Sequence, residues 1–142
     1  MHIKIIYIGK IKERIYDIKF RKYVEWMSRD AKIDIITLKE SHSSKIINQF
    51  KNLKKSNHFI ICLSERGKNF DSISFSNFVF SCGNKIVFIL GNHEGLPGVL
   101  IKKSDFNLSL SKMTMPHEMA NLVLAEQLYR AFSIKKGSNY HR

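Results

Sequence analysis

The residues best suited to chemistry gather in the last third of the chain, in polar stretches that follow short apolar runs. Residues 91–95 (GNHEG) follow the apolar run 85–90, and residues 109–116 (SLSKMTMP) follow the run 106–110. The chain ends in GSNYHR at 137–142. Glycines, methionines and an aromatic, basic tail favour a ligand that binds through backbone groups, apolar walls and stacking.

The glycine-bracketed loop at 91–95 permits a ligand to approach the backbone, because glycine lacks a side chain. Its spacing differs from the G-x-G-x-x-G pattern of dinucleotide sites, and no Lys-Ser or Lys-Thr pair follows as in a Walker loop. The alternative interpretation is a simple turn between a strand and a helix.

The loop at 109–116 offers backbone groups that could bind an adenine or a carboxylate. Met113 and Met115 could form the walls of an apolar pocket. The alternative interpretation is a strand end whose methionines fill the core.

A long helix is predicted from Pro116, since proline is favoured in the first turn. Its apolar residues cover more than one face, which favours packing against a second subunit. Glu126 and Arg130 are four residues apart and can pair along the helix. Such a pair is usually only a solvated contact, but it could also aim Arg130 at a phosphate or a base.

The tail places Tyr140, His141 and Arg142 together, and such a set can stack on a base and hold phosphate. Tails are also commonly frayed and without function. His117, near the helix start, is more often structural than catalytic in such a position. Arg66, in the polar stretch 64–69, could contact phosphate or lie in a solvated loop.

The elements that must position these residues alternate between strand and helix. The predicted strands are 2–8, 32–38, 58–63, 85–90 and 106–110, and the predicted helices are 11–29, 46–53, 71–81, 96–103 and 116–134. This alternation predicts an α/β fold with a mostly parallel sheet flanked by helices. Ligands of such sheets bind beyond the carboxyl ends of strands, so the loops after Leu63, Leu90 and Leu110 are the candidates.

Composition favours one domain spanning residues 1–142 and an anionic partner. The formal net charge is +12, which favours a polyanion such as nucleic acid. Cys62 and Cys82 lie in apolar runs without zinc-binding spacing, as expected for free thiols in a reducing cytoplasm. The first residues do not have the pattern of a signal peptide, and no apolar run is long enough to span a membrane.

Three stretches together resemble the RlmH family, the small SPOUT-class methyltransferases of bacterial 23S ribosomal RNA. They are LSERGK at 63–68, FILGNHEGL at 88–96, and LSLSKMTMPHEMANLVLAEQLYRAFSIKKGSNYHR at 108–142. The resemblance implies a SPOUT-type fold with a C-terminal trefoil knot, and a homodimer formed through the knot region and last helix. It also implies S-adenosyl-L-methionine as cofactor and methylation of N3 of a pseudouridine in helix 69, on the assembled ribosome in the cytoplasm.

The family's cofactor positions fall on residues of the three loops: Leu63, Gly91, Asn92, Ser111, Lys112, Met113, Thr114, Met115 and Pro116. Asn92 stands where the family usually has glycine. Because asparagine tolerates the left-handed region, we expect the backbone shape to survive there, whereas its side chain is what would crowd a cofactor.

Within that resemblance, loss of the N3 proton suggests His117 or His141 as a base, and Arg130 or Arg142 as a stabiliser of the developing anion. Positioning and electrostatics are favoured over a dedicated base. The predicted substrate-binding residues are Arg66, Tyr140, His141 and Arg142, and methyl transfer to nitrogen requires no metal. The rival interpretations are a non-catalytic RNA-binding protein, another nucleotide-dependent enzyme, and a structural dimer.

Overall fold

The computed structural model describes residues 1–39 and 43–142. Strands and helices alternate along the chain, as predicted: β1 His2–Ile8, α1 Arg14–Met27, β2 Lys32–Leu38, α2 Ser43–Lys55, β3 Phe59–Lys68, α3 Ser72–Ser81, β4 Lys85–Leu90, α4 Gly98–Lys103, β5 Phe106–Leu108 and α5 His117–Lys136.

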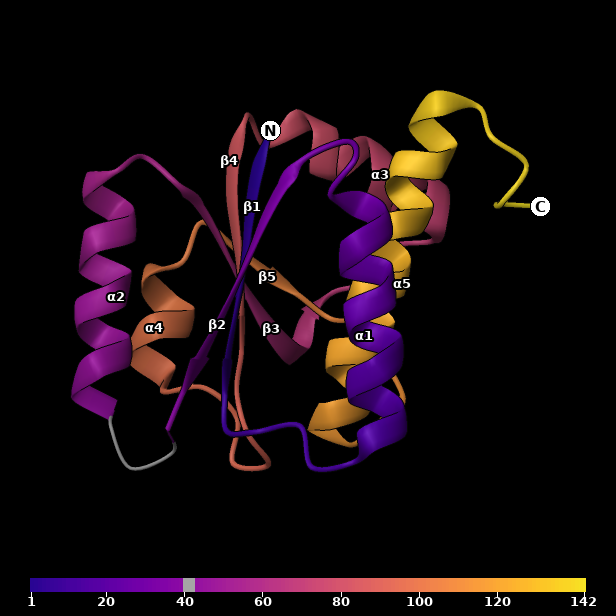
Figure 1. Ribbon diagram of the computed structural model, residues 1–142. Helices are drawn as coiled ribbons and strands as arrows, with labels where there is room; N and C mark the ends of the chain where they lie inside the picture. Colours follow the sequence, from indigo (N-terminus) through magenta and orange to yellow (C-terminus); the bar gives the residue numbers. More distant parts are fainter. Residues whose placement is uncertain (40–42) are drawn as a thin grey trace.

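The strands form a single sheet in the order β2-β1-β4-β3-β5, with every neighbouring pair parallel. Helices α1, α3 and α5 cover one face, and α2 and α4 cover the other (Figure 1). The α/β fold with a parallel sheet flanked by helices is confirmed, and the trefoil knot stays a prediction.

The central strands carry the core because both of their faces are covered by helices. Five of the six residues of β4 are buried, which matches the continuous apolar run expected of such a strand. Alternate side chains enter the two cores: Ile86 and Phe88 pack on the α1, α3 and α5 side, whereas Val87 and Ile89 pack on the α2 and α4 side.

The prediction that residues 64–69 form a loop was wrong, because β3 continues to Lys68. Leu63 and Lys68 both pair with Leu108 of β5, so the residues between them bulge out of the ladder. A Cβ added at Gly67 would lie 2.6 Å from the backbone carbon of Leu108. Glycine is therefore required where the bulge crosses β5.

Element ends also differ from prediction in places. Helix α1 begins at Arg14 rather than at 11, and β5 ends at Leu108 rather than at 110. Helix α5 begins directly after Pro116 and ends at Gly137, whose left-handed φ of 70° closes the helix.

Helix α5 runs the full depth of the molecule, against the direction of the strands (Figure 1). At its start, Glu118 accepts a hydrogen bond from the backbone N–H of Glu13, at 3.0 Å, beyond the carboxyl end of β1. At its end, Lys136 pairs with Asp30, just before β2, at 2.8 Å. The helix therefore starts at the carboxyl edge of the sheet and finishes at the amino edge.

Among the described residues, no helix combines the length and the apolar character that crossing a membrane requires.

Candidate cofactor and substrate site

Three loops meet at the carboxyl edge of the sheet because β4, β3 and β5 are neighbours. They are the β3 bulge after Leu63, the turn after Leu90 and the loop after Leu108. The sequence predicted candidate loops at these three places, but the first is a bulge within β3 and the last begins two residues earlier than expected. Because the strands are parallel, their carboxyl ends bring these loops together, although Leu63 and Leu108 are 45 positions apart in the chain.

The turn after β4 is closed on itself. A Cβ added at Gly91 would lie 2.5 Å from the backbone carbon of Gly95, so residue 91 must be glycine. Gly95 has a φ of 79°, and its N–H donates to the backbone oxygen of Asn92 at 2.9 Å. Both glycines of the bracket are therefore required by the backbone geometry.

Asn92 stands where the family usually has glycine, and its side chain takes a position that the sequence did not predict. Its φ is not positive; Gly95 is the residue of the turn in the left-handed region. The Asn92 side-chain oxygen accepts from the N–H of Glu94 at 2.9 Å. The side chain is thus engaged by its own loop, in an Asx turn.

The loop after β5 is held by side chains rather than by regular structure. Asn69 donates through Nδ2 to the backbone oxygen of Ser109 at 3.0 Å, and the Ser109 hydroxyl donates to the oxygen of Ser111 at 2.8 Å. The N–H of Met113 donates to the Ser111 hydroxyl at 2.9 Å. The role of Asn69 was not predicted from the sequence, because it is one of several polar residues in the stretch 64–69.

The methionine of this loop is not a core filler. Met113 is 80% exposed, whereas Met115 is half-buried. An exposed thioether on a hydrogen-bonded loop suits the wall of an apolar ligand site.

Asn121, near the start of α5, carries a buried acceptor at this edge. It lies four residues into α5 and is 2% exposed, and its side-chain oxygen has no hydrogen-bond partner among the described residues. A buried acceptor without a donor costs about 1–3 kcal/mol. Backbone groups, methionines and an unpaired amide oxygen fit a neutral adenine and an amino acid portion better than a phosphate.

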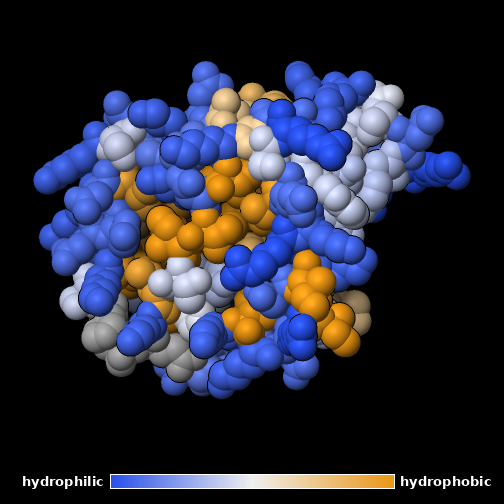
Figure 2. Space-filling model, viewed as in Figure 1, coloured by the Kyte–Doolittle hydropathy of each residue, from blue (hydrophilic) through white to orange (hydrophobic). Residues whose placement is uncertain are grey.

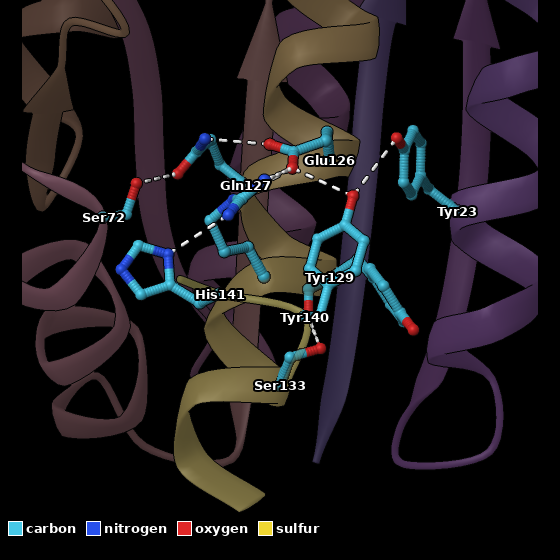
Figure 3. Close-up of polar contacts among 9 residues, drawn as sticks. Tyr23, Ser72, Glu126, Gln127, Tyr129, Ser133, Tyr140 and His141 are labelled. Atoms are coloured by element: carbon cyan, nitrogen blue, oxygen red, sulfur yellow. Dashed lines mark hydrogen bonds and ion pairs between the residues drawn. The ribbon is translucent and has the colours of Figure 1, made fainter. Parts of the chain in front are cut away.

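The tail packs back onto α5, where it joins a polar cluster (Figure 3). Arg130 donates through Nε to Glu126 at 2.9 Å, which confirms the predicted pair. Tyr140 donates to the same carboxylate oxygen at 3.1 Å and lies under the guanidinium of Arg130, 4.8 Å from the ring centre. Tyr23, from α1, reaches the Tyr140 hydroxyl at 3.4 Å.

This cluster fixes the charges of its members. The hydrogen bonds that Arg130 donates to Glu126 raise the pKa of Arg130, so its guanidinium stays cationic. Burial, followed by the Tyr23 and Glu126 contacts, raises the pKa of Tyr140, which keeps its phenol neutral. Arg130 also lies 3.1 Å from Nδ1 of His141. A guanidinium can only donate, so Nδ1 of His141 is the acceptor in this contact.

The predicted site residues therefore fall into two groups. Tyr140 and His141 of the tail lie against Arg130 of α5, and Arg142, the next residue of the tail, is exposed. His117 is apart from them, at the carboxyl edge, where its ring centre lies 6.5 Å from that of His93.

Arg66 is exposed on the β3 bulge, with the cofactor loops. The nine residues from His117 to Glu126 correspond to roughly 13 Å of helix, so the structure does not bring the tail cluster onto these loops. Tyr23 was missed because a residue on α1, over 100 positions from the tail, leaves no local signal.

Grooves open between the helices on both faces of the sheet. One, of about 400 Å³, lies between α1 and α5 beside Glu126. The other, of about 500 Å³, lies between α2 and α4 on the opposite face. In the part of the chain that the structure describes, no three His, Cys, Asp or Glu side chains are grouped as a metal site.

Comparison with known sequences gives matches over the whole chain. Residues 1–141 match the family described as "Predicted SPOUT methyltransferase". The chain is similar to "Ribosomal RNA large subunit methyltransferase H" of Clostridium botulinum (strain Alaska E43 / Type E3), at 34% identity over 159 aligned positions that cover 100% of both proteins.

Comparison with solved structures supports the fold. A probable methylase family protein from Haemophilus influenzae Rd KW20 superposes with a TM-score of 0.63 at 15% identity, over 99% of this chain and 70% of that chain. The SpoU methyltransferase AviRb from Streptomyces viridochromogenes, solved in complex with the cofactor AdoMet, superposes with a TM-score of 0.54 at 11% identity, over 97% of this chain and 61% of that chain.

Proposed function

The chain belongs to the SPOUT methyltransferase family, and from this premise we propose the reaction that it catalyses. It is an S-adenosylmethionine-dependent methyltransferase of large-subunit ribosomal RNA. We propose that the acceptor is N3 of a pseudouridine in helix 69, on the assembled ribosome in the cytoplasm, and that residues 1–142 act as one domain. The grouping of three ligand-type loops at the ends of β4, β3 and β5 is the observation that carries this proposal.

The cofactor residues are proposed on the three loops: Leu63, Gly91, Asn92 and Ser111 to Pro116. When bound, S-adenosylmethionine supplies an electrophilic methyl group. The chain's part is to hold the adenine and the amino acid portion through backbone groups and apolar walls. The closed turn at Gly91 and the hydrogen bonds of Ser109 and Ser111 support this role, because a preordered loop loses little entropy on binding.

We propose a homodimer in which the tail of one copy completes the site of the other. Within one chain, the tail cluster lies along α5 away from the cofactor loops. Two chains packed through antiparallel α5 helices would bring each tail toward the partner's carboxyl edge. Such a dimer has isologous contacts, as most homodimers do.

The surface of α1 and α5 supports this dimer. The groove between these helices includes the half-buried Leu122 and Val123. Figure 2 shows apolar atoms over α1 within a hydrophilic surround, and the exposed apolar residues of α1 are Ile15, Ile18 and Trp26. A second copy seated there would cover them.

In the proposed mechanism, the chain contributes position and charge. N3 loses its proton as the methyl group arrives, and negative charge develops on the pyrimidine oxygens. Arg130 is a fixed cation held by Glu126, and it stabilises that charge together with Arg142. His141 accepts from Arg130 through Nδ1, so we propose that it orients Arg130 rather than acting as the base. His117, at the carboxyl edge, is the residue proposed to accept the proton through water.

The substrate-binding residues are proposed to be Arg66 on the β3 bulge and Tyr140, His141 and Arg142 of the partner's tail. Tyr140 keeps a neutral aromatic ring that can stack on a base. This role and that of Arg130 require the tail cluster to meet the cofactor loops across the dimer.

The test is calorimetric titration with S-adenosylmethionine, with ATP and NAD as controls, followed by methylation of ribosomes that lack the modification. We expect binding of S-adenosylmethionine alone. Arg130→Gln should lower kcat by roughly 10²- to 10³-fold with unchanged cofactor binding. Arg142→Ala and His117→Ala should each lower activity. Tight ribosome binding without cofactor binding would instead favour a non-catalytic RNA-binding protein.

A further inference from the structure

A second groove lies between α2 and α4, on the face of the sheet opposite to α5. It encloses about 500 Å³. Its floor is apolar, and Val99 is 47% exposed there. The floor residues are Ile47, Phe50, Val99 and Leu100, and the rim residues are Lys51, Lys54, Lys55 and Lys103.

The two helices that form this groove carry only positive charge. They contain six lysines and no acidic residue: Lys45, Lys51, Lys54, Lys55, Lys102 and Lys103. Lys54 pairs with Asp105 at 2.8 Å, and Asp105 is further held by the N–H of Ile60 at 2.7 Å. Among the described residues, Lys51, Lys55 and Lys103 have no carboxylate within 4.0 Å. Three ammonium groups around one apolar floor are thus open to an anionic partner.

We propose that this groove docks a strand of ribosomal RNA outside the target nucleotide. Backbone phosphates bind the lysines of the rim, and an unstacked nucleotide covers the apolar floor. Lysines without carboxylate partners complement the repeated charge of a phosphate backbone, and unpaired bases have the apolar faces that such a floor accepts. The identity of the partner as ribosomal RNA rests on the proposed function; the charge and shape of the groove do not.

The position of the groove fits this role. Helix α4 follows directly from the turn at 91–97, so the Val99 end of the groove lies near the proposed cofactor loops, whereas its Lys54 end lies beside Asp105, at the starts of β3 and β5. It lies on the opposite face of the sheet from α1 and α5, which are proposed to form the dimer. A dimer would therefore present two such grooves, both open, one beside each site.

The test compares two triple variants with the same loss of charge. The first replaces the groove lysines: Lys51→Gln, Lys55→Gln and Lys103→Gln. The control replaces exposed cations at the amino edge of the sheet: Arg29→Gln, Lys32→Gln and Lys85→Gln. Binding to protein-free 23S ribosomal RNA and to whole ribosomes is measured over a range of salt concentrations.

The groove variant should bind both probes roughly 10- to 100-fold more weakly at physiological salt, and its salt slope should fall by about 3. The control variant should stay close to the unchanged protein. A third variant with arginine at the three groove positions should recover binding, because it keeps the charge; recovery would exclude misfolding as the cause.

Equal losses in the groove and control variants would overturn the proposal, since net charge alone would explain them. A loss on ribosomes but not on protein-free RNA would also overturn it and would indicate an acidic protein surface as the partner. Neither readout uses methylation or S-adenosylmethionine. Failure of the proposed function would appear separately, as absent cofactor binding or methyl transfer in the unchanged protein.

Discussion

The carboxyl and amino edges of the sheet differ in the length of their loops and in the contacts that hold them. At the carboxyl edge, long loops are shaped by glycines and side-chain hydrogen bonds, as at Gly91 and Ser109, and leave Met113 exposed and Asn121 unpaired. At the amino edge, short connections are closed by polar pairs: His2 with Asp34 at 2.6 Å, His58 with Ser56 at 2.8 Å, and Lys136 with Asp30 at 2.8 Å.

The difference separates stability from binding. Polar pairs at the amino edge anchor strand starts and the end of α5, whereas the carboxyl edge carries the loops that are shaped for a ligand. Among the described residues, one buried side-chain atom is unpaired at each edge: Nε2 of His58 and the side-chain oxygen of Asn121. The sequence predicted that tail residues form part of the site, which lies at the carboxyl edge, but the tail leaves α5 at the amino edge. The proposed second copy of the chain would resolve this mismatch.

The largest effect is expected from adding a side chain at Gly91, in the turn at the carboxyl edge. In Gly91→Ala, the new Cβ would meet the backbone of Gly95 at 2.5 Å and force the turn open. We expect S-adenosylmethionine affinity to fall at least about tenfold, and the free energy of unfolding to fall by about 1–3 kcal/mol. Calorimetry and urea unfolding measure the two quantities.

Gly98→Ala is the matched control, because a Cβ there meets nothing within 4 Å. It should change neither quantity. Normal cofactor binding by Gly91→Ala would mean that the turn does not form the cofactor site.

A smaller effect is expected at Asn121, where substitution should preserve or raise the stability but lower the cofactor affinity. Asn121→Leu removes a buried acceptor without a partner, so the cofactor-free protein should be equally stable or about 1 kcal/mol more stable. Cofactor affinity should fall if the cofactor supplies the missing donor. Asn52→Leu, on the exposed side of α2, is the control and should not alter affinity. Destabilisation of Asn121→Leu with unchanged affinity would show that the amide has a structural partner.

The smallest effect is expected at the amino edge. Burial lowers the pKa of His58, and the nearby charges of Lys4, His2 and Lys85 add to this. The unfolded chain protonates His58 near pH 6.5, whereas the folded chain does so only at lower pH. The free energy of unfolding should therefore fall as pH drops below about 6.5 and level off below the folded pKa.

Urea unfolding between pH 8 and pH 4 measures this slope, and His58→Phe should reduce it. His93→Gln changes an exposed histidine at the other edge and should leave the slope unchanged. Methyl transfer assayed at pH 8 should be the same in His58→Phe as in the unchanged protein. A slope that survives in His58→Phe would place the acid sensitivity elsewhere.

The sequence predicted the elements well where a pattern is local. The run KIVFIL at 85–90 indicated a buried strand, and β4 has those bounds. The Glu126–Arg130 pair followed from its spacing on one helix. The β3 bulge was not predictable, because it depends on the pairing of Lys68 with Leu108, 40 positions later, and polar composition alone indicates a loop.

The site was predictable by residue type but not by arrangement. Spacing marked the tail residues, yet it did not show that Tyr140 and His141 would close on Glu126 and Arg130, or that Tyr23 from α1 would join them. Spacing also did not show that His117 would lie apart from these residues, at the carboxyl edge. Such contacts depend on the path of α5 through the molecule, which only packing determines.

The most direct test of the account mixes two inactive variants. One carries Gly91→Ala, and the other lacks residues 138–142. If the partner's tail completes each site, mixed dimers contain one site with an intact turn and an intact tail. Random exchange of subunits should then restore about one quarter of normal methyl transfer. If each chain uses its own tail, every site in the mixture is defective, and an absence of restored activity would contradict the account.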